Sequence, residues 1–287
     1  CAIEIFWGIS QLLGIKQSNH VLFALTGSFN NPGPYGGFLA VCASLLAAFC
    51  VNQKELSKNN SVARVAIIFV TFVTVIAISF LPFTQSRASL LAFGLSMLLL
   101  CIGSRTIRYL YNKYLNKYTW GVILFFFFFF PIAYTIKKPS ADGRFFIDKI
   151  CIKAICENDI LGSGYMSFGE KYSNVQATYF KQIINEKGKD EFDWTAVNEH
   201  ERMIADCPEY AFNEYLQIGV ERGPLIMLLF IFIIAIAIIT SFKRRTIWFC
   251  GLVALSIFAL FSYPFHIISF QIFLLSLFIF CMLDRMP

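Results

Sequence analysis

Residues 225–242 read Leu225-Ile-Met-Leu-Leu-Phe-Ile-Phe-Ile-Ile-Ala-Ile-Ala-Ile-Ile-Thr-Ser-Phe242 and contain no charged side chain. A helix needs about 20 apolar residues to cross the roughly 30 Å hydrocarbon layer of a bilayer. Comparable stretches lie at Ile3–Ile15, Tyr35–Val51, Val62–Leu81, Leu90–Gly103, Trp120–Ile136, Ile247–Ser262 and Phe265–Leu283. Only Tyr263-Pro264 separates the last two, either as a tight turn or as a kink. We therefore predict an all-α polytopic membrane protein with about eight transmembrane helices.

The composition excludes the other broad classes of protein. Hydrophobic residues make up 57% of the chain and charged residues 15%, against roughly 25% charged residues in an average soluble domain. A soluble protein of this composition would expose too much apolar surface to stay in solution. Disordered chains are poor in aromatic residues, whereas this chain contains 33 Phe.

The net charge of +6 is distributed unevenly along the chain. Residues 137–222 hold 11 basic and 15 acidic residues, whereas the rest of the chain holds 13 basic and 3 acidic residues. No basic cluster typical of a nucleic-acid-binding surface is visible, so no nucleic acid is expected as a partner. The basic residues instead mark three short connections, at Lys54, Lys58 and Arg64, at Arg105, Arg108, Lys113 and Lys117, and at Lys243, Arg244 and Arg245. Cytoplasmic loops are enriched in Lys and Arg, so residues 16–34, 82–87 and 137–222 should face outward.

The outward segment 137–222 is too long for a plain connection, and it divides the chain into three parts. We expect transmembrane helices one to five in residues 1–136 and helices six to eight in residues 223–287. Between the fifth and sixth helix, residues 137–222 should form a large extracytoplasmic loop subdomain with amphipathic helices. Because the chain begins with Cys1 rather than Met, we expect further helices to precede it.

The first part of this loop predicts a helix in residues 144–157, after a turn at Asp142-Gly143. Its apolar residues recur at helical spacing, at Phe146, Ile147, Ile150, Cys151 and Ala154. This pattern is typical of an amphipathic helix that lies along the membrane interface. The glycine-rich segment that follows, residues 162–169, predicts a flexible loop.

A second helix is predicted to begin at Asp206-Cys-Pro-Glu209. This segment offers an acidic N-cap, a Pro in the first turn and a Glu three residues after the cap. The helix would then carry one polar stripe, formed by Tyr210, Asn213, Glu214, Gln217 and Glu221. The stripe is either a solvated helix face or the polar wall of a substrate-binding site at the outer membrane face.

Arg87 is the most informative single residue. It lies at the outer end of a short loop, against the preference of basic residues for the cytoplasmic side. It also lies at a predicted helix N-terminus, where the helix dipole disfavours a cation. Both features indicate an anionic partner, either a carboxylate of the outer loop or a phosphate bound in bidentate fashion. Arg144, in the outer loop, is a second arginine that could join it.

Five motifs in this order resemble a known family. They are Asn31-Pro-Gly-Pro-Tyr-Gly-Gly-Phe-Leu39, Ser86-Arg-Ala-Ser-Leu-Leu91, Asp142-Gly-Arg-Phe-Phe-Ile147, Leu161-Gly-Ser-Gly-Tyr-Met-Ser-Phe168 and Asn213-Glu-Tyr-Leu-Gln-Ile-Gly-Val-Glu-Arg-Gly223. The chain resembles the O-antigen ligase family over about residues 20–240, and is similar especially to members from Bacteroidetes-type bacteria. That family includes O-antigen ligases, O-antigen polymerases and protein O-oligosaccharyltransferases.

The resemblance implies a multi-pass protein of the bacterial inner membrane with about a dozen crossings and its active face in the periplasm. It implies transfer of a glycan from undecaprenyl pyrophosphate, without a metal or cofactor. The acceptor is lipid A–core in ligases, a glycan repeat unit in polymerases and a protein hydroxyl in oligosaccharyltransferases. Arg87 and Arg144 match two family arginines, which would bind the pyrophosphate and stabilise the charge of the leaving group.

One position departs from the family pattern. Family ligases place a His, the proposed base for the acceptor hydroxyl, where this chain has Phe212. Glu214, Glu209 and His200 are candidate replacement bases. On a regular helix Glu214 would point roughly 200° away from position 212, whereas Glu209 would lie about one turn before it. Tyr210, Asn213, Gln217 and Glu221 would then form the substrate-binding wall beside Arg87 and Arg144.

Two other functions compete with glycan transfer. A transporter or lipid flippase should carry ionisable groups near the middle of several crossings, and the crossings predicted here are nearly free of charge. A relative that binds a lipid-linked glycan without transferring it would also explain Phe212.

Overall fold

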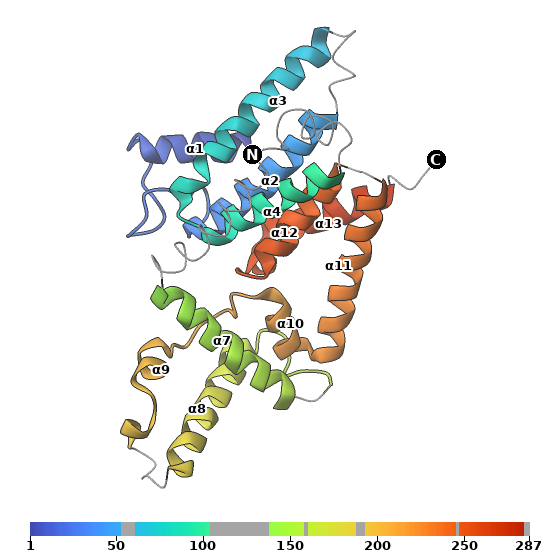
Figure 1. The fold of residues 1–287 in the computed structure, drawn as a ribbon. Coiled ribbons are helices and arrows are strands. Elements are labelled where there is room, and N and C mark those ends of the chain that lie inside the picture. The colour runs from blue at the N-terminus through green and yellow to red at the C-terminus, as the bar shows by residue number, and fades with distance from the viewer. Residues whose placement is uncertain (53–60, 104–137, 158–159, 188–192, 245–246, 284–287) are drawn as a thin grey trace, which may run out of the picture. The chain divides into compact units, whose positions relative to one another are not determined.

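A computed structural model of the chain describes residues 1–52, 61–103, 138–157, 160–187, 193–244 and 247–283. These residues form helices joined by turns and loops, with no strand among them, so the predicted all-α fold is confirmed (Figure 1). The chain forms two compact units. One comprises Cys1–Trp120 with Ile234–Pro287, and the other comprises Gly121–Ile233.

The first unit is a bundle of apolar helices around α2. Its elements are α1 (Ala2–Leu12), α2 (Pro32–Asn52), α3 (Ser61–Phe80), the 3-10 helix η1 (Pro82–Thr84), α4 (Arg87–Gly103), α12 (Trp248–Ala259), η5 (Pro264–His266) and α13 (Ile268–Leu283). Helix α2 packs against α3, α4 and α12. It begins three residues before the predicted apolar stretch, at Pro32. The side chain of Asn31 accepts a hydrogen bond from the Gly33 amide at 2.9 Å, and Pro32 needs no partner in the first turn.

Among the residues that the structure describes, three helices are long and apolar enough to cross a membrane, at Pro32–Val51, Ser61–Thr84 and Pro224–Phe242. Shorter apolar helices lie at Arg87–Ile102, Trp248–Ala259 and Ile268–Cys281. The predicted first crossing contains only the 11 residues of α1, about 16 Å of helix, and the predicted fifth crossing lies outside the described residues. The region around Pro264 is a break between two helices rather than a kink in one, because η5 separates α12 from α13.

Glycines allow α2 to approach its neighbours closely. A Cβ on Gly37 would lie 2.2 Å from a ring carbon of Phe258 in α12, and a Cβ on Gly36 would lie 2.6 Å from the hydroxyl of Thr84. Only a residue without a side chain fits at such distances. The motif that carries these glycines therefore holds α2 against the turn that leads into Arg87.

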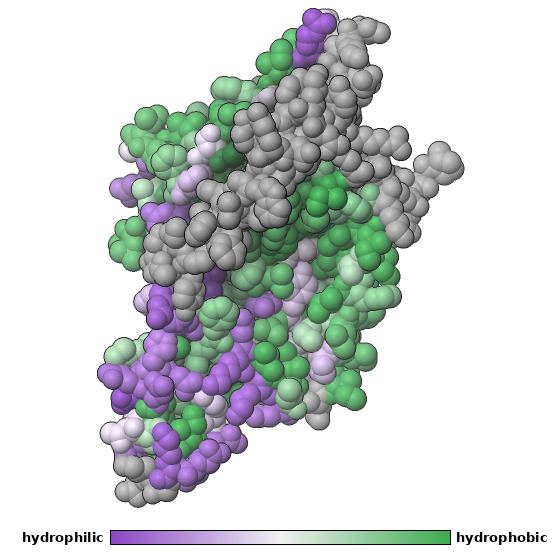
Figure 2. Space-filling view, in the orientation of Figure 1, coloured by the Kyte–Doolittle hydropathy of each residue, from purple (hydrophilic) through white to green (hydrophobic). Residues whose placement is uncertain are grey.

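The second unit contains α7 (Lys138–Glu157), α8 (Phe168–Glu186), η4 (Trp194–Ala196), α9 (Glu199–Ile204), α10 (Glu214–Arg222) and the beginning of α11 (Pro224–Arg244). Helix α7 packs against α8, α9 and α10. Hydrophilic side chains predominate over α8 and α9, whereas α11 is hydrophobic over its visible surface (Figure 2). Leu225, Leu228 and Phe232 are among the exposed apolar residues of α11.

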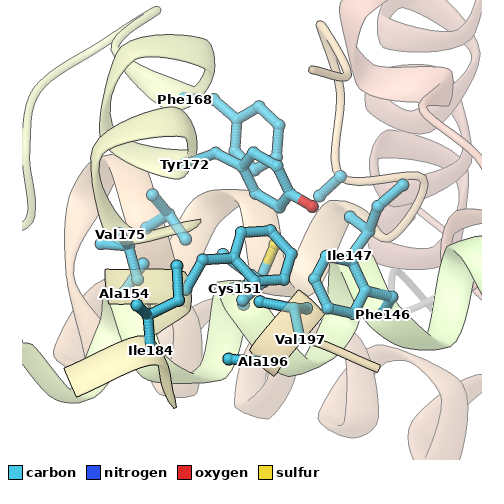
Figure 3. Close-up of a cluster of buried hydrophobic side chains, with 14 residues drawn as sticks. Phe146, Ile147, Cys151, Ala154, Phe168, Tyr172, Val175, Ile184, Ala196 and Val197 are labelled. Carbon is cyan, nitrogen blue, oxygen red and sulfur yellow. The ribbon is translucent and has the colours of Figure 1, made fainter. Parts of the chain in front are cut away.

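The apolar stripe of α7 consists of the predicted residues, but it packs against other helices of the same unit rather than against the membrane interface. Phe146, Ile147, Ile150, Cys151 and Ala154 are its buried residues. They pack against Phe168, Tyr172 and Val175 of α8, and side chains of the two helices point toward one another (Figure 3). The sequence assigned this stripe to the membrane interface, and that interpretation is wrong because the stripe is covered by the unit's own core. A period of 3.6 residues identifies a buried face without identifying what buries it.

Two predicted helix boundaries are also wrong. Asp142-Gly143 does not form a turn, because α7 runs without interruption from Lys138. The second helix does not begin near Pro208, because residues 205–213 form no helix and α10 begins at Glu214. The side chain of Asp206 accepts a hydrogen bond from the adjacent Cys207 amide, whereas an N-cap accepts from the second or third residue of the helix.

The glycine-rich loop after α7 is attached to the end of α10. The amides of Ser163 and Gly164 donate to the carbonyls of Val220 and Glu221 at 3.0 and 2.8 Å. Gly162 and Gly223 both have positive φ, and a Cβ on Gly223 would lie 1.9 Å from the carbonyl oxygen of Ile160. The family-like motifs around residues 161–168 and 213–223 are therefore two halves of one tightly packed junction.

Candidate functional site

Arg87 is the first residue of α4, as the sequence predicts. Two residues before it, Gln85 has a left-handed backbone, with φ of 52°. The hydroxyl of Ser86 accepts hydrogen bonds from the Ser89 amide at 3.3 Å and the Ser89 hydroxyl at 2.6 Å. Ser86 therefore acts as an N-cap, and Arg87 follows it directly. Because a cation at a helix N-terminus is opposed by the dipole, this position favours an anionic partner.

Arg144 lies in the second turn of α7 rather than at its start. Its guanidinium carbon is 5.0 Å from the centre of the Phe212 ring. This is a cation–π geometry, in which the ring face attracts the positive charge. Phe212, the residue at the position of the family His, is therefore in contact with one of the two arginines that the sequence singled out.

The backbone around Phe212 explains why α10 begins late. Phe212 has φ of 53°, a left-handed conformation that is rare for a residue with a bulky side chain. Asn213 follows in an extended conformation and caps α10, because its side chain accepts a hydrogen bond from the Leu216 amide at 3.3 Å. A helix cannot pass through these two residues. The predicted positions of Glu214, roughly 200° away from residue 212, and of Glu209, one turn before it, both assumed a continuous helix. They therefore do not apply.

Asp148 is a residue of this region that the sequence analysis missed. It follows Arg144 by one helical turn and forms a side-chain hydrogen bond with Asn213. Burial raises the pKa of Asp148 to about 6, although the charge of Arg144 and the hydrogen bond from Asn213 act to lower it. The spacing Arg144-x-x-x-Asp148, which places the two side chains one helical turn apart, is the sequence signal that could have indicated this residue.

The polar stripe of α10 is real but shorter than predicted. Glu214, Gln217 and Glu221 are at most 5% exposed. The amide nitrogen of Gln217 donates to Glu221 at 3.3 Å, and the side-chain oxygen of Gln217 accepts from the Ala211 amide at 3.0 Å. The solvated-face interpretation is therefore wrong for these three residues. Tyr210 lies in the segment before α10 and does not belong to the stripe.

The two other candidate bases lie in different surroundings. His200 is on α9, where its Nε2 atom is 3.1 Å from Oδ2 of Asp142 and its side chain is 57% exposed. Glu209 is exposed in the segment before α10. The structure instead brings together Arg144, Asp148, Phe212 and Asn213, which we call the Arg144 cluster.

The charged and polar groups of the Arg144 cluster suit an anionic ligand and a hydroxyl group. It offers a guanidinium for phosphate oxygens and a carboxylate that accepts hydrogen bonds. Among the described residues, no three His, Cys, Asp or Glu side chains are grouped so that they could hold a metal ion.

Comparisons with known proteins agree with the motifs. No curated protein and no solved structure matches the chain. The sequence profile described as O-antigen ligase matches residues 72–231, more than half of the chain. The match includes α4 with Arg87, the whole Arg144 cluster and the polar stripe of α10. On this match, together with its all-helical fold and membrane-spanning helices, the chain belongs to the O-antigen ligase family.

Proposed function

We propose that this protein is an inner-membrane glycosyltransferase that moves a glycan from undecaprenyl pyrophosphate to an acceptor on the periplasmic side. Family membership supports an activity of the O-antigen ligase or polymerase type. The single observation that carries the proposal within this chain is the Arg144 cluster, where a guanidinium on a ring face lies beside a half-buried carboxylate.

In the proposed reaction the acceptor hydroxyl attacks the anomeric carbon of the donor glycan. The bond from that carbon to the pyrophosphate breaks, and its electron pair stays on the phosphate oxygen. Arg144 and Arg87 are each proposed to bind the pyrophosphate, because a guanidinium stabilises the charge that develops on this leaving group. A carboxylate or imidazole receives the proton of the acceptor hydroxyl.

The remaining polar residues have proposed roles in substrate binding. Asn213, Gln217 and Glu221 lie at the cap and along one face of α10, and Tyr210 lies four residues before that helix. Hydrogen-bonding side chains of this kind suit the hydroxyl groups of a sugar. Glu214, Glu209 and His200 remain candidate bases in this proposal.

The experiment that tests the function is a comparison of lipid-linked and surface glycans in a deletion strain of the source bacterium. Short-core lipopolysaccharide with accumulated full-length lipid-linked chains would indicate ligation to lipid A–core. Single-repeat products would indicate a polymerase, and unglycosylated proteins would indicate protein O-glycosylation. Unchanged glycans of all three kinds would contradict the proposal.

A reconstituted assay separates transfer from transport and from binding alone. The purified protein is incorporated into liposomes that contain the undecaprenyl-pyrophosphate glycan extracted from the deletion strain. Release of undecaprenyl pyrophosphate that depends on an added acceptor supports the transferase. Movement of the lipid-linked glycan between leaflets without release would indicate a flippase, and binding without either would indicate a relative that has lost catalysis.

A further inference from the structure

We propose that Asp148 is the proton acceptor of this protein and replaces the His that is absent at position 212. This inference rests on the proposed glycan transfer and assigns a step of that reaction to a residue. It does not follow from the family pattern, in which the base belongs to the segment that precedes α10.

The position of Asp148 supports this assignment. Its side chain forms a hydrogen bond with Asn213, the residue next to Phe212. Arg144, one helical turn earlier on α7, places its guanidinium over the Phe212 ring. Two contacts therefore place Asp148 near position 212. One is its hydrogen bond with Asn213, the next residue after Phe212, and the other is the contact of its neighbour Arg144 with the Phe212 ring.

The alternative bases are less suitable by position. His200 pairs with Asp142 in the first turns of α7, and Glu209 is exposed in the segment before α10. Glu214 is 1% exposed and lies inside the first turn of α10, beyond the cap formed by Asn213. Asp148 is half-buried, so that its carboxylate keeps access to a hydroxyl group while remaining partly desolvated.

The surroundings of Asp148 suit proton transfer near neutral pH. On α7 itself it faces Arg144 and interacts with Cys151, whose thiol pKa is raised by burial and by the Asp148 charge. Next to the α10 cap Asn213, Glu214 is the nearest acidic residue in sequence. On α8, burial raises the pKa of Tyr172, and on α9 Glu201 is paired with Lys149 and Tyr179. The thiol and the phenol stay neutral where Asp148, with its pKa of about 6, titrates.

The proposed step balances without a further reactant. The oxygen of the acceptor hydroxyl forms a bond to the anomeric carbon, and its proton passes to a carboxylate oxygen of Asp148. The pyrophosphate leaves with the electron pair of the broken bond. The proton on Asp148 then returns to solvent, which restores the carboxylate. A group with a pKa close to the working pH both accepts and releases a proton at low cost.

The first test measures transfer by the full chain in liposomes as a function of pH. The rate of the natural protein should rise as the pH increases through about 6, because only the carboxylate accepts a proton. Asp148→Asn should lower kcat by 100-fold or more, leave the KM for the donor within about threefold, and abolish this rise. Asp148→Glu should recover part of the rate. The control is Asp206→Asn, an exposed Asp of the same unit, which should keep both rate and profile.

A rate for Asp148→Asn within threefold of the natural protein would overturn the inference while leaving the glycosyltransferase intact. A natural protein that shows no acceptor-dependent transfer at all would instead contradict the proposed function. Because Asn and Asp have the same shape, the melting temperature of each variant separates loss of chemistry from loss of fold. An Asp148→Asn protein that melts no lower than the natural one, and loses the pH-dependent rise, supports the inference.

The second test moves the base to the family position. Combining Asp148→Asn with Phe212→His should raise the rate at least tenfold above that of Asp148→Asn alone, because an imidazole at 212 supplies the missing proton acceptor. A folded double variant that binds the donor but remains as slow as the single variant would overturn the equivalence of the two positions.

Discussion

The guanidinium carbon of Arg144 lies 5.0 Å from the centre of the Phe212 ring. The ring therefore occupies the position of the family His while it holds the arginine that we assign to the pyrophosphate. A left-handed backbone at Phe212, with φ of 53°, is a costly conformation for such a residue, on the order of 1–3 kcal/mol. Its presence beside Arg144 is consistent with strain that is retained at a functional site.

Replacing Phe212 by Leu should remove the cation–π contact with Arg144 without unfolding the second unit. A cation–π contact contributes about 0.5–2 kcal/mol, so transfer measured as kcat/KM should fall roughly 2- to 30-fold. The matched control is Phe145→Leu, at a side chain on α7 that is 66% exposed, and it should change little. Equal losses in the two variants would mean that the ring at 212 has no special relation to Arg144.

Arg87→Ala should abolish glycan transfer while the protein remains in the membrane at its normal level. The reason is that the first residue of α4 would no longer neutralise the leaving pyrophosphate. Transfer is scored by the surface glycan of the deletion strain complemented with the variant, and expression by immunoblotting. Arg202→Ala, at an exposed arginine of α9, serves as the control. Complementation by Arg87→Ala at the natural level would contradict the assignment of Arg87 to the donor.

Asn213→Ala should affect both stability and the pH profile. Loss of the α10 cap should cost about 0.5–2 kcal/mol. Because the hydrogen bond from Asn213 lowers the pKa of Asp148, its removal should shift the rise of the transfer rate to higher pH. Asn198→Ala removes the corresponding cap of α9, so it should destabilise the protein without this shift. A shift in the pH dependence of the transfer rate in both variants, or in neither, would argue against the contact between Asn213 and Asp148.

Asp148→Asn should make the protein more stable at pH 8 although it should inactivate it. The pKa of Asp148 is about 6 in the folded protein and 3.8 ordinarily, so the folded state binds the proton more tightly. Protonated Asp148 therefore contributes to the free energy of unfolding. This contribution is fully present below about pH 3.8 and is lost as the pH rises through about 6. The free energy of unfolding of the natural protein relative to the variant should therefore fall between pH 4 and pH 8, by on the order of 1 kcal/mol because the group is partly exposed. Melting temperatures measured across this range check the change. A variant that is less stable at pH 8 would indicate a structural carboxylate.

Gly223→Ala should destabilise the junction between the loop after α7 and the end of α10. Gly223 has φ of 86° and ψ of 164°, a region essentially restricted to glycine, and a Cβ there would overlap the carbonyl of Ile160. The cost should be on the order of 1–3 kcal/mol or more, visible as a lower melting temperature. Gly169→Ala is the control, because a Cβ at that position meets no atom within 4 Å. A neutral Gly223→Ala would mean that this junction relaxes freely.

Much of the chain could be predicted from local pattern. The apolar stretches at 35–51, 62–81 and 225–242 predicted α2, α3 and α11, because length and hydrophobicity are sufficient to define a helix that can cross a membrane. The stripe from Phe146 to Ala154 predicted the buried face of α7 for the same reason, since burial and helical period are both visible in sequence. Arg87 was placed correctly at a helix start.

The sequence by itself therefore determined the helical fold, the membrane-spanning character and the family of this protein. It did not determine where α10 begins. Residues 206–209 carry the pattern of an N-cap, but the left-handed backbone of Phe212, which interrupts a helix there, is not visible in the sequence. It also did not reveal Asp148, because its burial is a property of the folded chain and its hydrogen bond comes from Asn213, 65 residues away in the sequence. Local patterns specify helices, whereas the proton affinity of a side chain depends on neighbours that only the tertiary structure brings together.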